Sequence, residues 1–461
     1  MTFPRYLLLL SLVWTNFFIG PLRTLGQDET AVDTNPRTSR ERSFIQIREQ
    51  EIKPTVRAIA PMDDNNVFFL NRRGQVGAAK FSPGLSQIGW ELYSSVKLNA
   101  MNSLTIGPNY SIITASPTEL TQGFDTDANG SLDFFEAIVS DWPGRSEGVT
   151  ITAGPVTQPN GKVLFALSPY ASEEGATPLA KLVAWSPPVK DKGATTLVVP
   201  APGGVAPRAA ALEVVTESTL PIGAFAISDT GLLACRLYMP EYKDGYYVSL
   251  TELPVPPAVS ETAQVPQTLP SLLIPAELTK KTQPTELVFF RENGAEKLII
   301  TCPDSKQLVE IEPAKSGATW GGSILVRAIT EKAVMTLIDM GKGHLLAGGD
   351  DGFIPLETSK DVYRISRVSL AEDGITLDFT APVDRFAAVK PDSYSVRAFS
   401  LQGGESSLVV RPVIESDGRT IILKTPNLKA RTVLRVVCQN VPSEDGKKLL
   451  STAVSYTIHE R

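Results

Sequence analysis

The sequence predicts an all-β protein, a β-propeller of six blades followed by an immunoglobulin-like β-sandwich. A phrase of apolar strand, polar turn and second apolar strand recurs about six times before residue 358. Shorter strands then follow at close intervals as far as the C-terminus. Asn-Gly, Asp-Thr-Gly and Gly-Pro-Asn turns stand between strands in the first region, and Asp-Gly turns stand between strands in the second, because Gly and Asn tolerate the positive φ of tight turns.

The propeller is predicted over residues 50–358. The repeated phrase occupies 56–70, 104–114, 149–167, 224–235, 287–301 and 334–347. Copies roughly 45 to 75 residues apart suit four-stranded blades with loops of variable length. A pair of stacked β-sandwiches stays open as an alternative, because strand repeats alone do not establish that a ring closes. The proline-dense stretch 254–275 is predicted to be a surface excursion between blades.

The sandwich is predicted over residues 359–461. Its strands are expected at 368–370, 375–379, 394–399, 408–411, 420–423, 432–437 and 454–458. About seven short strands in about 100 residues are typical of an immunoglobulin-like sandwich.

The segment 125–136 matches the spacing of a calcium-binding loop. Calcium prefers six to eight oxygen ligands, and the loop template places them at fixed positions around a glycine turn. Gly130 occupies that turn, and Leu132 supplies the apolar residue two positions later. The candidate Ca²⁺ ligands are Asp125, Asp127, Asn129, the Ser131 carbonyl, Asp133 and Glu136. The alternative is an acidic turn whose charges stay in solvent.

The flanks of this loop differ from those of an EF-hand. Residues 115–124 contain Pro117 and Gly123 and lack helical apolar spacing. We therefore expect an EF-hand-like loop that joins two β-strands and makes the fold rigid, without a sensor function.

Composition and the N-terminus limit the partners and the location. The formal net charge is −6, without a long run of Lys or Arg, which argues against nucleic acid and anionic membranes as partners. Residues 1–26 are predicted to be a signal peptide and 27–49 a flexible leader, so a secreted or periplasmic protein without a transmembrane segment is expected. An uncleaved membrane anchor is the alternative.

The three cysteines, Cys235, Cys302 and Cys438, lie in apolar strand-like runs and are predicted to be small buried residues. A Cys235–Cys302 bridge is the alternative. The two histidines, His344 and His459, are predicted to be structural or solvated.

Two passages resemble the secreted six-bladed propellers related to glucose/sorbosone dehydrogenases, in particular their planctomycete-type versions. They are the acidic passage 118–136 and the sandwich passages 362–384 and 445–458. The resemblance implies a sugar oxidoreductase that uses a quinone cofactor and a histidine base early in the propeller. This sequence has no histidine before His344 and no Cys-x-x-Cys-His haem motif, so the expected base is missing.

The sequence hypothesis is therefore a secreted, non-catalytic calcium-binding propeller that presents a surface to a protein or glycan partner. The alternative is a quinone-dependent sugar dehydrogenase that uses Arg145 and carboxylates in place of histidine. A propeller hydrolase with a carboxylate pair is a third option, but the spacing selects no pair.

Overall fold

The computed structural model is nearly all β. It describes residues 45–46, 54–82, 87–94, 103–127, 129–169, 179–187, 212–237, 245–253, 271–275, 285–292, 294–316, 319–340, 345–356, 362–400, 405–426 and 428–459. The predicted signal peptide, nearly all of the predicted leader and His344 lie outside these residues. Within them, no helix is long and apolar enough to cross a membrane.

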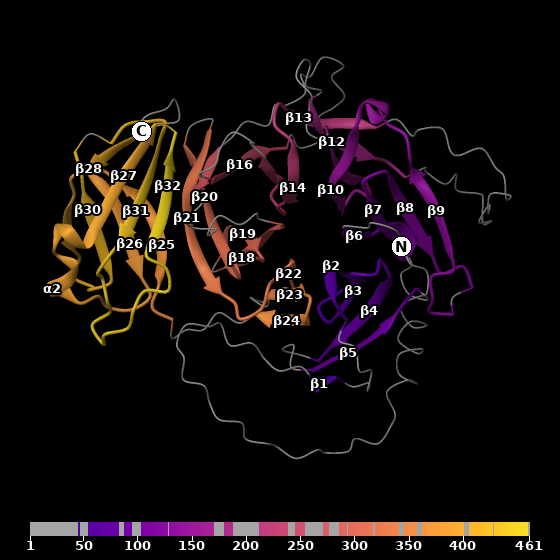
Figure 1. Ribbon diagram of the computed structural model, residues 1–461, viewed down its shortest axis with the longest axis horizontal. Helices are drawn as coiled ribbons and strands as arrows, with labels where there is room; N and C mark the ends of the chain where they lie inside the picture. Colours follow the sequence, from indigo (N-terminus) through magenta and orange to yellow (C-terminus); the bar gives the residue numbers. More distant parts are fainter. Residues whose placement is uncertain are drawn as a thin grey trace.

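Six sheets of antiparallel strands surround a common axis, one of them with a short parallel strand at its outer edge, and the first antiparallel strand of each is innermost (Figure 1). Blade 1 contains β2 (Val56–Pro61), β3 (Asn66–Asn71), β4 (Val76–Phe81) and β5 (Gln87–Leu92), with the short β1 (Ile45–Gln46) beside β5. Blade 2 contains β6 (Ser103–Ile106), β7 (Ile112–Ser116), β8 (Glu119–Phe124) and β9 (Phe134–Val139). Blade 3 contains β10 (Val149–Thr157), β11 (Val163–Pro169), β12 (Ala180–Trp185) and β13 (Glu213–Ser218).

The other three blades continue around the ring. Blade 4 contains β14 (Ile222–Ile227), β15 (Leu232–Leu237), β16 (Gly245–Glu252) and β17 (Leu272–Pro275). Blade 5 contains β18 (Leu287–Glu292), β19 (Ala295–Cys302), β20 (Gln307–Ser316) and β21 (Thr319–Ile329). Blade 6 contains β22 (Thr336–Asp339), β23 (Leu345–Gly349) and β24 (Gly352–Leu356). Two single turns of 3-10 helix, η2 (Pro108–Tyr110) and η3 (Arg145–Glu147), lie in the loops.

The ring closes between blade 1 and blade 6. Each innermost strand contacts the next one around the axis, and β2 contacts β22 as well as β6. Phe69 of β3 is fully buried and meets Phe353 of β24 edge to face, with ring centroids 5.2 Å apart. The closed propeller decides against the alternative of two stacked sandwiches, and it confirms the predicted fold class.

The sandwich has two sheets around its own apolar core. One sheet contains β25 (Ile365–Ala371), β26 (Gly374–Phe379), β30 (Thr420–Lys424) and β29 (Arg411–Ile414). The other contains β32 (Ala453–Ile458), β31 (Thr432–Cys438), β27 (Tyr394–Ser400) and β28 (Glu405–Leu408). A one-turn helix, α2 (Arg385–Ala388), and η4 (Pro391–Ser393) connect β26 to β27.

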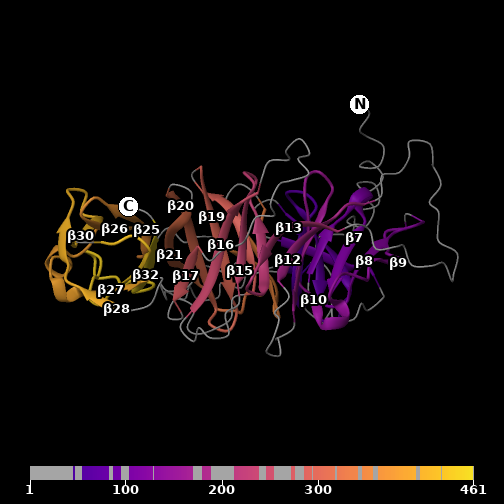
Figure 2. The ribbon, with the colours of Figure 1, turned by 90° about the horizontal axis from the view of Figure 1, so that it is seen from above.

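The propeller and the sandwich share one continuous sheet. The last strand of the sandwich, β32, pairs antiparallel with β21, the outermost strand of blade 5, and produces the eight-stranded order β18-β19-β20-β21-β32-β31-β27-β28. The sandwich therefore lies beside blade 5 and covers its edge (Figure 2). The pairing covers Gly322–Leu325 of β21, and backbone groups paired in this way are not available for aggregation.

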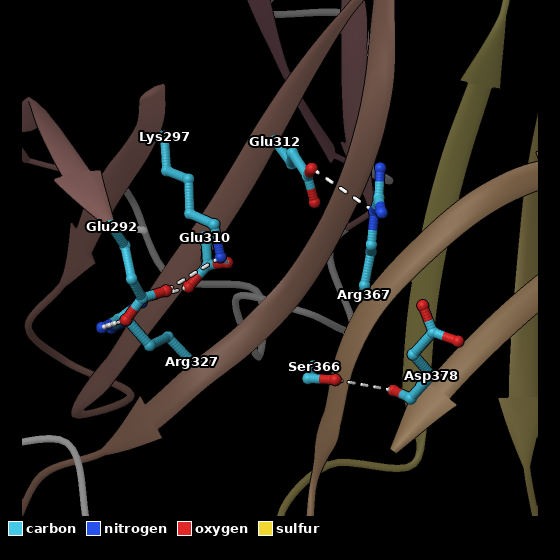
Figure 3. Close-up of polar contacts among 8 residues, drawn as sticks. All are labelled: Glu292, Lys297, Glu310, Glu312, Arg327, Ser366, Arg367 and Asp378. Atoms are coloured by element: carbon cyan, nitrogen blue, oxygen red, sulfur yellow. Dashed lines mark hydrogen bonds and ion pairs between the residues drawn. The ribbon is translucent and has the colours of Figure 1, made fainter. Parts of the chain in front are cut away.

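Four charged side chains form a network across the strands of blade 5 (Figure 3). Glu292, Lys297, Glu310 and Arg327 come from β18, β19, β20 and β21. Glu310 has no exposed side-chain surface and accepts Lys297 Nζ at 2.6 Å, and Arg327 Nη2 donates to Glu292 Oε1 at 2.7 Å. The positive charges of Lys297 and Arg327 neutralise the negative charges of the two glutamates. A buried charge needs an oppositely charged partner of this kind.

Two details of the predicted strands are wrong. The run 408–411 is not one strand: β28 ends at Leu408, and β29 begins at Arg411 in the opposite sheet. The chain crosses between the sheets there, with Val409 exposed and Val410 in the core. The proline-dense stretch also ends in a strand, because β17 pairs with β16 as the outermost strand of blade 4. Pro275 is its last residue, a position that an edge strand tolerates.

Candidate functional site

A cavity of about 430 Å³ lies on the propeller axis. Its wall is formed by β2, β6, β7, β10 and β14, with Thr285 and Glu286 just before β18 and Met335 just before β22. All six blades therefore contribute to it. This volume lies in the range of small-molecule sites in proteins.

Three of the inner strands carry a β-bulge at the cavity wall. Arg57 in β2, Thr152 in β10 and Gly223 in β14 each have no partner in the register with the next strand, and each lines the cavity. Bulges re-aim side chains and are frequent next to functional sites. The third bulge residue is Gly because the Arg236 guanidinium lies 2.1 Å from the place that a Cβ would occupy.

Hydroxyl groups at the wall connect adjacent blades. Thr152 Oγ1 donates to the Ile222 carbonyl at 2.6 Å, between blades 3 and 4. Thr285 Oγ1 donates to the Met335 carbonyl at 3.2 Å, between blades 5 and 6. The Ser103 hydroxyl donates to the Gly154 carbonyl of β10, between blades 2 and 3. These bonds hold the wall rigid and occupy most of its hydroxyl groups.

Among the residues that the structure describes, the ionisable side chains of the wall are Arg57 and Glu286. Arg57 is exposed, and within the described residues its guanidinium makes no ion pair. Glu286 Oε2 accepts the Leu337 amide at 2.8 Å, and its own amide donates to Thr301 Oγ1 at 3.1 Å. Burial raises the pKa of the Glu286 carboxyl to about 7, since the charged form loses hydration and gains no cationic partner. The cavity thus holds one cation and one carboxyl that titrates near neutrality.

The acidic loop joins β8 to β9, as the sequence predicts, and these strands pair antiparallel. Asp125 Oδ1 accepts the Asn129 amide at 3.1 Å, and Asp125 Oδ2 accepts the Gly130 amide at 2.9 Å. Gly130 has φ +85°, the left-handed conformation that favours glycine. The turn of the loop is therefore organised around the Asp125 carboxylate.

The loop is anchored on blade 1. The Leu132 side chain is buried among core residues of blades 1 and 2, and the Leu132 amide donates to the Tyr93 carbonyl at 2.7 Å. Burial raises the pKa of Tyr93 to about 12, and the negative charge of Asp125 and a hydrogen bond to it act in the same direction.

The remaining candidate ligands bond to other residues of the loop or lie outside its turn. Asp127 accepts the Asn129 side-chain amide at 2.8 Å, while Asp133 accepts the Thr126 hydroxyl at 2.7 Å, which lowers the pKa of Asp133. Ser131 follows the turn, and Glu136 lies on β9 opposite Gln122. Within the described part of the chain, no three Asp, Glu, His or Cys side chains converge as a metal-binding group.

Other residues named from the sequence have structural surroundings. The three cysteines are buried free thiols, and burial raises the pKa of each. His459 Nε2 lies 2.6 Å from the Ser271 carbonyl. The Arg145 guanidinium stacks over the Trp142 ring, 5.3 Å from its centroid, and is absent from the cavity wall.

Sequence reasoning missed the cavity residues, yet a signal for three of them exists. The phrases Val56-Arg57-Ala58, Ile151-Thr152-Ala153 and Ile222-Gly223-Ala224 share one pattern, an apolar β-branched residue, the bulge residue and alanine. Glu286 carries no such signal, because its burial depends on blades far apart in the sequence.

No family model and no curated protein matches this chain. Solved structures with a similar fold include an oxidoreductase described as a glucose dehydrogenase from Thermus thermophilus, 17% identical over 67% of this chain and 97% of that chain, with a TM-score of 0.44. They also include the holo PQQ domain of a pyranose dehydrogenase from Coprinopsis cinerea. It is 12% identical over 66% of this chain and 93% of that chain, with a TM-score of 0.41. A calcium structure of a family AA12 carbohydrate-active enzyme from Trichoderma reesei is 12% identical over 68% of this chain and 100% of that chain, with a TM-score of 0.42. At these identities and TM-scores the likeness carries no inference about activity.

Proposed function

We propose that this protein is a carbohydrate-binding propeller whose ligand, of monosaccharide size, occupies the axial cavity. The observation that carries this proposal is the wall itself: all six blades contribute to it, and three of its inner strands each have a bulge residue that lines the cavity. Specific sites combine an apolar wall with a few placed polar groups, and here Ala58, Ile59 and Phe225 alternate with the hydroxyls and the two ionisable groups.

Filling the cavity tests this proposal. Arg57→Trp places a large side chain at an exposed bulge position, so we expect it to abolish sugar binding with little loss of stability. The matched control is Arg72→Trp, since Arg72 is also an exposed arginine of blade 1 but lies outside the cavity. Titration calorimetry with a panel of monosaccharides measures the difference. Equal binding by both variants would exclude the cavity as the site.

An oxidoreductase is the second candidate, and Glu286 is the observation that favours it. A carboxyl with a pKa of about 7 at a cavity wall suits a general base, the role that the sequence left unassigned. The described part of the wall does not fit pyrroloquinoline quinone, however, because that cofactor carries several carboxylates and these residues offer one cation, Arg57. Turnover of any sugar of the panel with this quinone, calcium and an electron-accepting dye would assign the protein to this class instead.

We further propose that the loop 125–136 binds Ca²⁺ through Asp125, Asp127, Asn129, the Ser131 carbonyl, Asp133 and Glu136. The left-handed Gly130 and the Asp125-centred turn support this proposal. Asp133 already accepts the Thr126 amide and hydroxyl, so it would contribute to the site through its remaining lone pairs or through a bridging water.

Millimolar Ca²⁺ is expected to raise the melting temperature, because a cation that binds only the folded state stabilises it. The double variant Asp125→Ala with Glu136→Ala should lose this increase. Asp229→Ala, which changes an exposed acid in the turn between β14 and β15, should keep it. Calorimetry scans with Ca²⁺ and with a chelator measure the shift, and an equal response of the three proteins would refute the calcium site.

A further inference from the structure

The sheet that joins the sandwich to blade 5 is buried on both faces. An antiparallel sheet of an isolated sandwich covers the core with one face and presents the other to solvent. On β31, Leu434 and Val436 are fully buried in the sandwich core. Val433 lies on the opposite face of this strand, yet only 1% of it is exposed, because it packs in the apolar cluster of blades 3 and 4. The propeller therefore covers the outer face of the sheet.

The neighbouring strands of this sheet show the same burial. On β32, Ser455 and Thr457 alternate with residues of the sandwich core and are 0% and 1% exposed. Ala453 of the same strand packs against the apolar cluster of blades 4 and 5. Phe399 of β27 is the register partner of Val433 and packs against the same cluster. Blade 4 is common to both clusters, so three strands of the sandwich bury their outer face against this blade.

Blade 4 also meets the sandwich at its outer edge. β32 contacts β17, and His459 Nε2 lies 2.6 Å from the carbonyl of Ser271, the residue before β17. β17 has four residues and pairs over its whole length with β16. A strand this short makes few ladder hydrogen bonds, so its position depends on the side chains that pack against it. The sandwich supplies part of that packing.

The same apolar clusters reach the axial cavity. Phe225 of β14 lines the cavity and belongs to the cluster that contains Val433. Ala224 also lines the cavity, and it belongs to the cluster on which Ala453 packs. Close-packed interiors transmit displacements, because they contain few voids that absorb them. Blade 4 thus connects the sandwich to the cavity wall through packed side chains.

We infer that the sandwich is a buttress for blade 4, which holds the blade in the ring and thereby sets the position of the cavity wall at Ala224 and Phe225. Opening of the sandwich uncovers the outer part of blade 4 and loosens the blade as far as β14. Blade 1 lies across the ring from blade 4 and keeps its protection (Figure 1). This coupling is a property of the scaffold and does not depend on which ligand the cavity binds.

Hydrogen exchange of the backbone amides, measured by mass spectrometry on the full chain, tests the coupling. The variant is Val436→Ala, which removes methyl groups from the sandwich core and leaves the face toward blade 4 intact. The void makes opening of the sandwich more frequent, so amides of β31 are expected to exchange about tenfold faster. Amides of β14 should accelerate by a similar factor, and those of β3 in blade 1 by less than about twofold.

Val67→Ala is the matched control, because Val67 of β3 is also a fully buried valine but lies in blade 1. It is expected to accelerate exchange in blade 1 and to leave β14 and β31 unchanged. Melting curves establish that each variant is folded. If Val436→Ala does not fold, Ile421→Val replaces it as a smaller deletion in the other sheet of the sandwich.

Two outcomes would overturn the inference. Faster exchange of β31 with unchanged exchange of β14 would show that the sandwich opens without loosening blade 4. Equal acceleration of β3 and β14 in Val436→Ala would show that the chain opens as one unit, with no particular link between the sandwich and blade 4. Acceleration of β14 without acceleration of β3 supports the buttress.

Discussion

Phe69→Ala is expected to destabilise the protein by about 3–5 kcal/mol, the range for removing a large aromatic side chain from a core. Phe69 is fully buried on β3 and packs edge to face on Phe353 of blade 6 and Trp90 of its own blade. The first and last blades of a propeller are far apart in the sequence, so packing between them must hold the ring closed. The cavity left by alanine lies at this closure.

Urea unfolding, followed by tryptophan fluorescence, measures this effect. Phe386→Ala is the control, because Phe386 on α2 is 86% exposed and its loss should change the free energy of unfolding by less than about 0.5 kcal/mol. If the two variants unfold at the same urea concentration, Phe69 does not support the closure.

Arg327→Ala is expected to destabilise the protein by about 3–5 kcal/mol, because it leaves the carboxylate of Glu310 buried with one of its two cations missing. The Arg327 guanidinium also lies over the Phe290 ring, 4.7 Å from its centroid, and this contact is lost too. Arg367→Ala is the control: this arginine is largely exposed and its nitrogen lies 3.5 Å from Glu312 across the joint with the sandwich, so less than about 1 kcal/mol is expected. Equal effects of the two substitutions would show that the buried network does not contribute to the free energy of unfolding.

The same network predicts how stability varies in acid. Burial acts to raise the pKa of Glu292, but the hydrogen bonds and charges of Arg327 and Lys297 outweigh it and lower that pKa to about 2. A depressed folded-state pKa stabilises the fold at every pH above the ordinary carboxyl value, near 4.5. This contribution is lost as the pH falls through about 2. The stability difference between the native protein and Arg327→Ala should therefore shrink between pH 5 and pH 2, which urea titrations at a series of pH values would measure.

Local patterns in the chain predicted much of this fold. Each of the six repeated phrases forms the two innermost strands of one blade, because apolar strand runs and turn formers such as Asn-Gly, Asp-Thr-Gly and Gly-Pro-Asn are properties of adjacent residues. The split of the run 408–411 was not predicted, because Val409 and Val410 continue an apolar run in the sequence. In the structure the chain crosses at these residues from the sheet of β28 to the sheet of β29. The N-cap of α2, where Asp384 Oδ1 accepts the Ala387 amide, belongs to a helix too short for a periodic signal.

For the candidate site, the sequence and the structure contribute different residues. The acidic loop is contiguous, so the spacing of its oxygen side chains could be recognised from the chain alone, and its calcium ligands stay a prediction. The axial cavity is assembled from all six blades, and no window of sequence contains more than one part of it.

The sequence by itself determined the all-β class, the order of propeller and sandwich, and the position of the acidic loop between two strands, because these features depend on neighbours along the chain. Only the tertiary structure decided that the ring closes through Phe69 and Phe353, that β32 extends the sheet of blade 5, and that Glu286 is buried at the wall of a cavity that Arg57 also lines. These depend on long-range packing and on the loss of hydration that follows from it. Burial is a property of the assembled ring, so the titration of Glu286 could not be inferred from its neighbours in the chain.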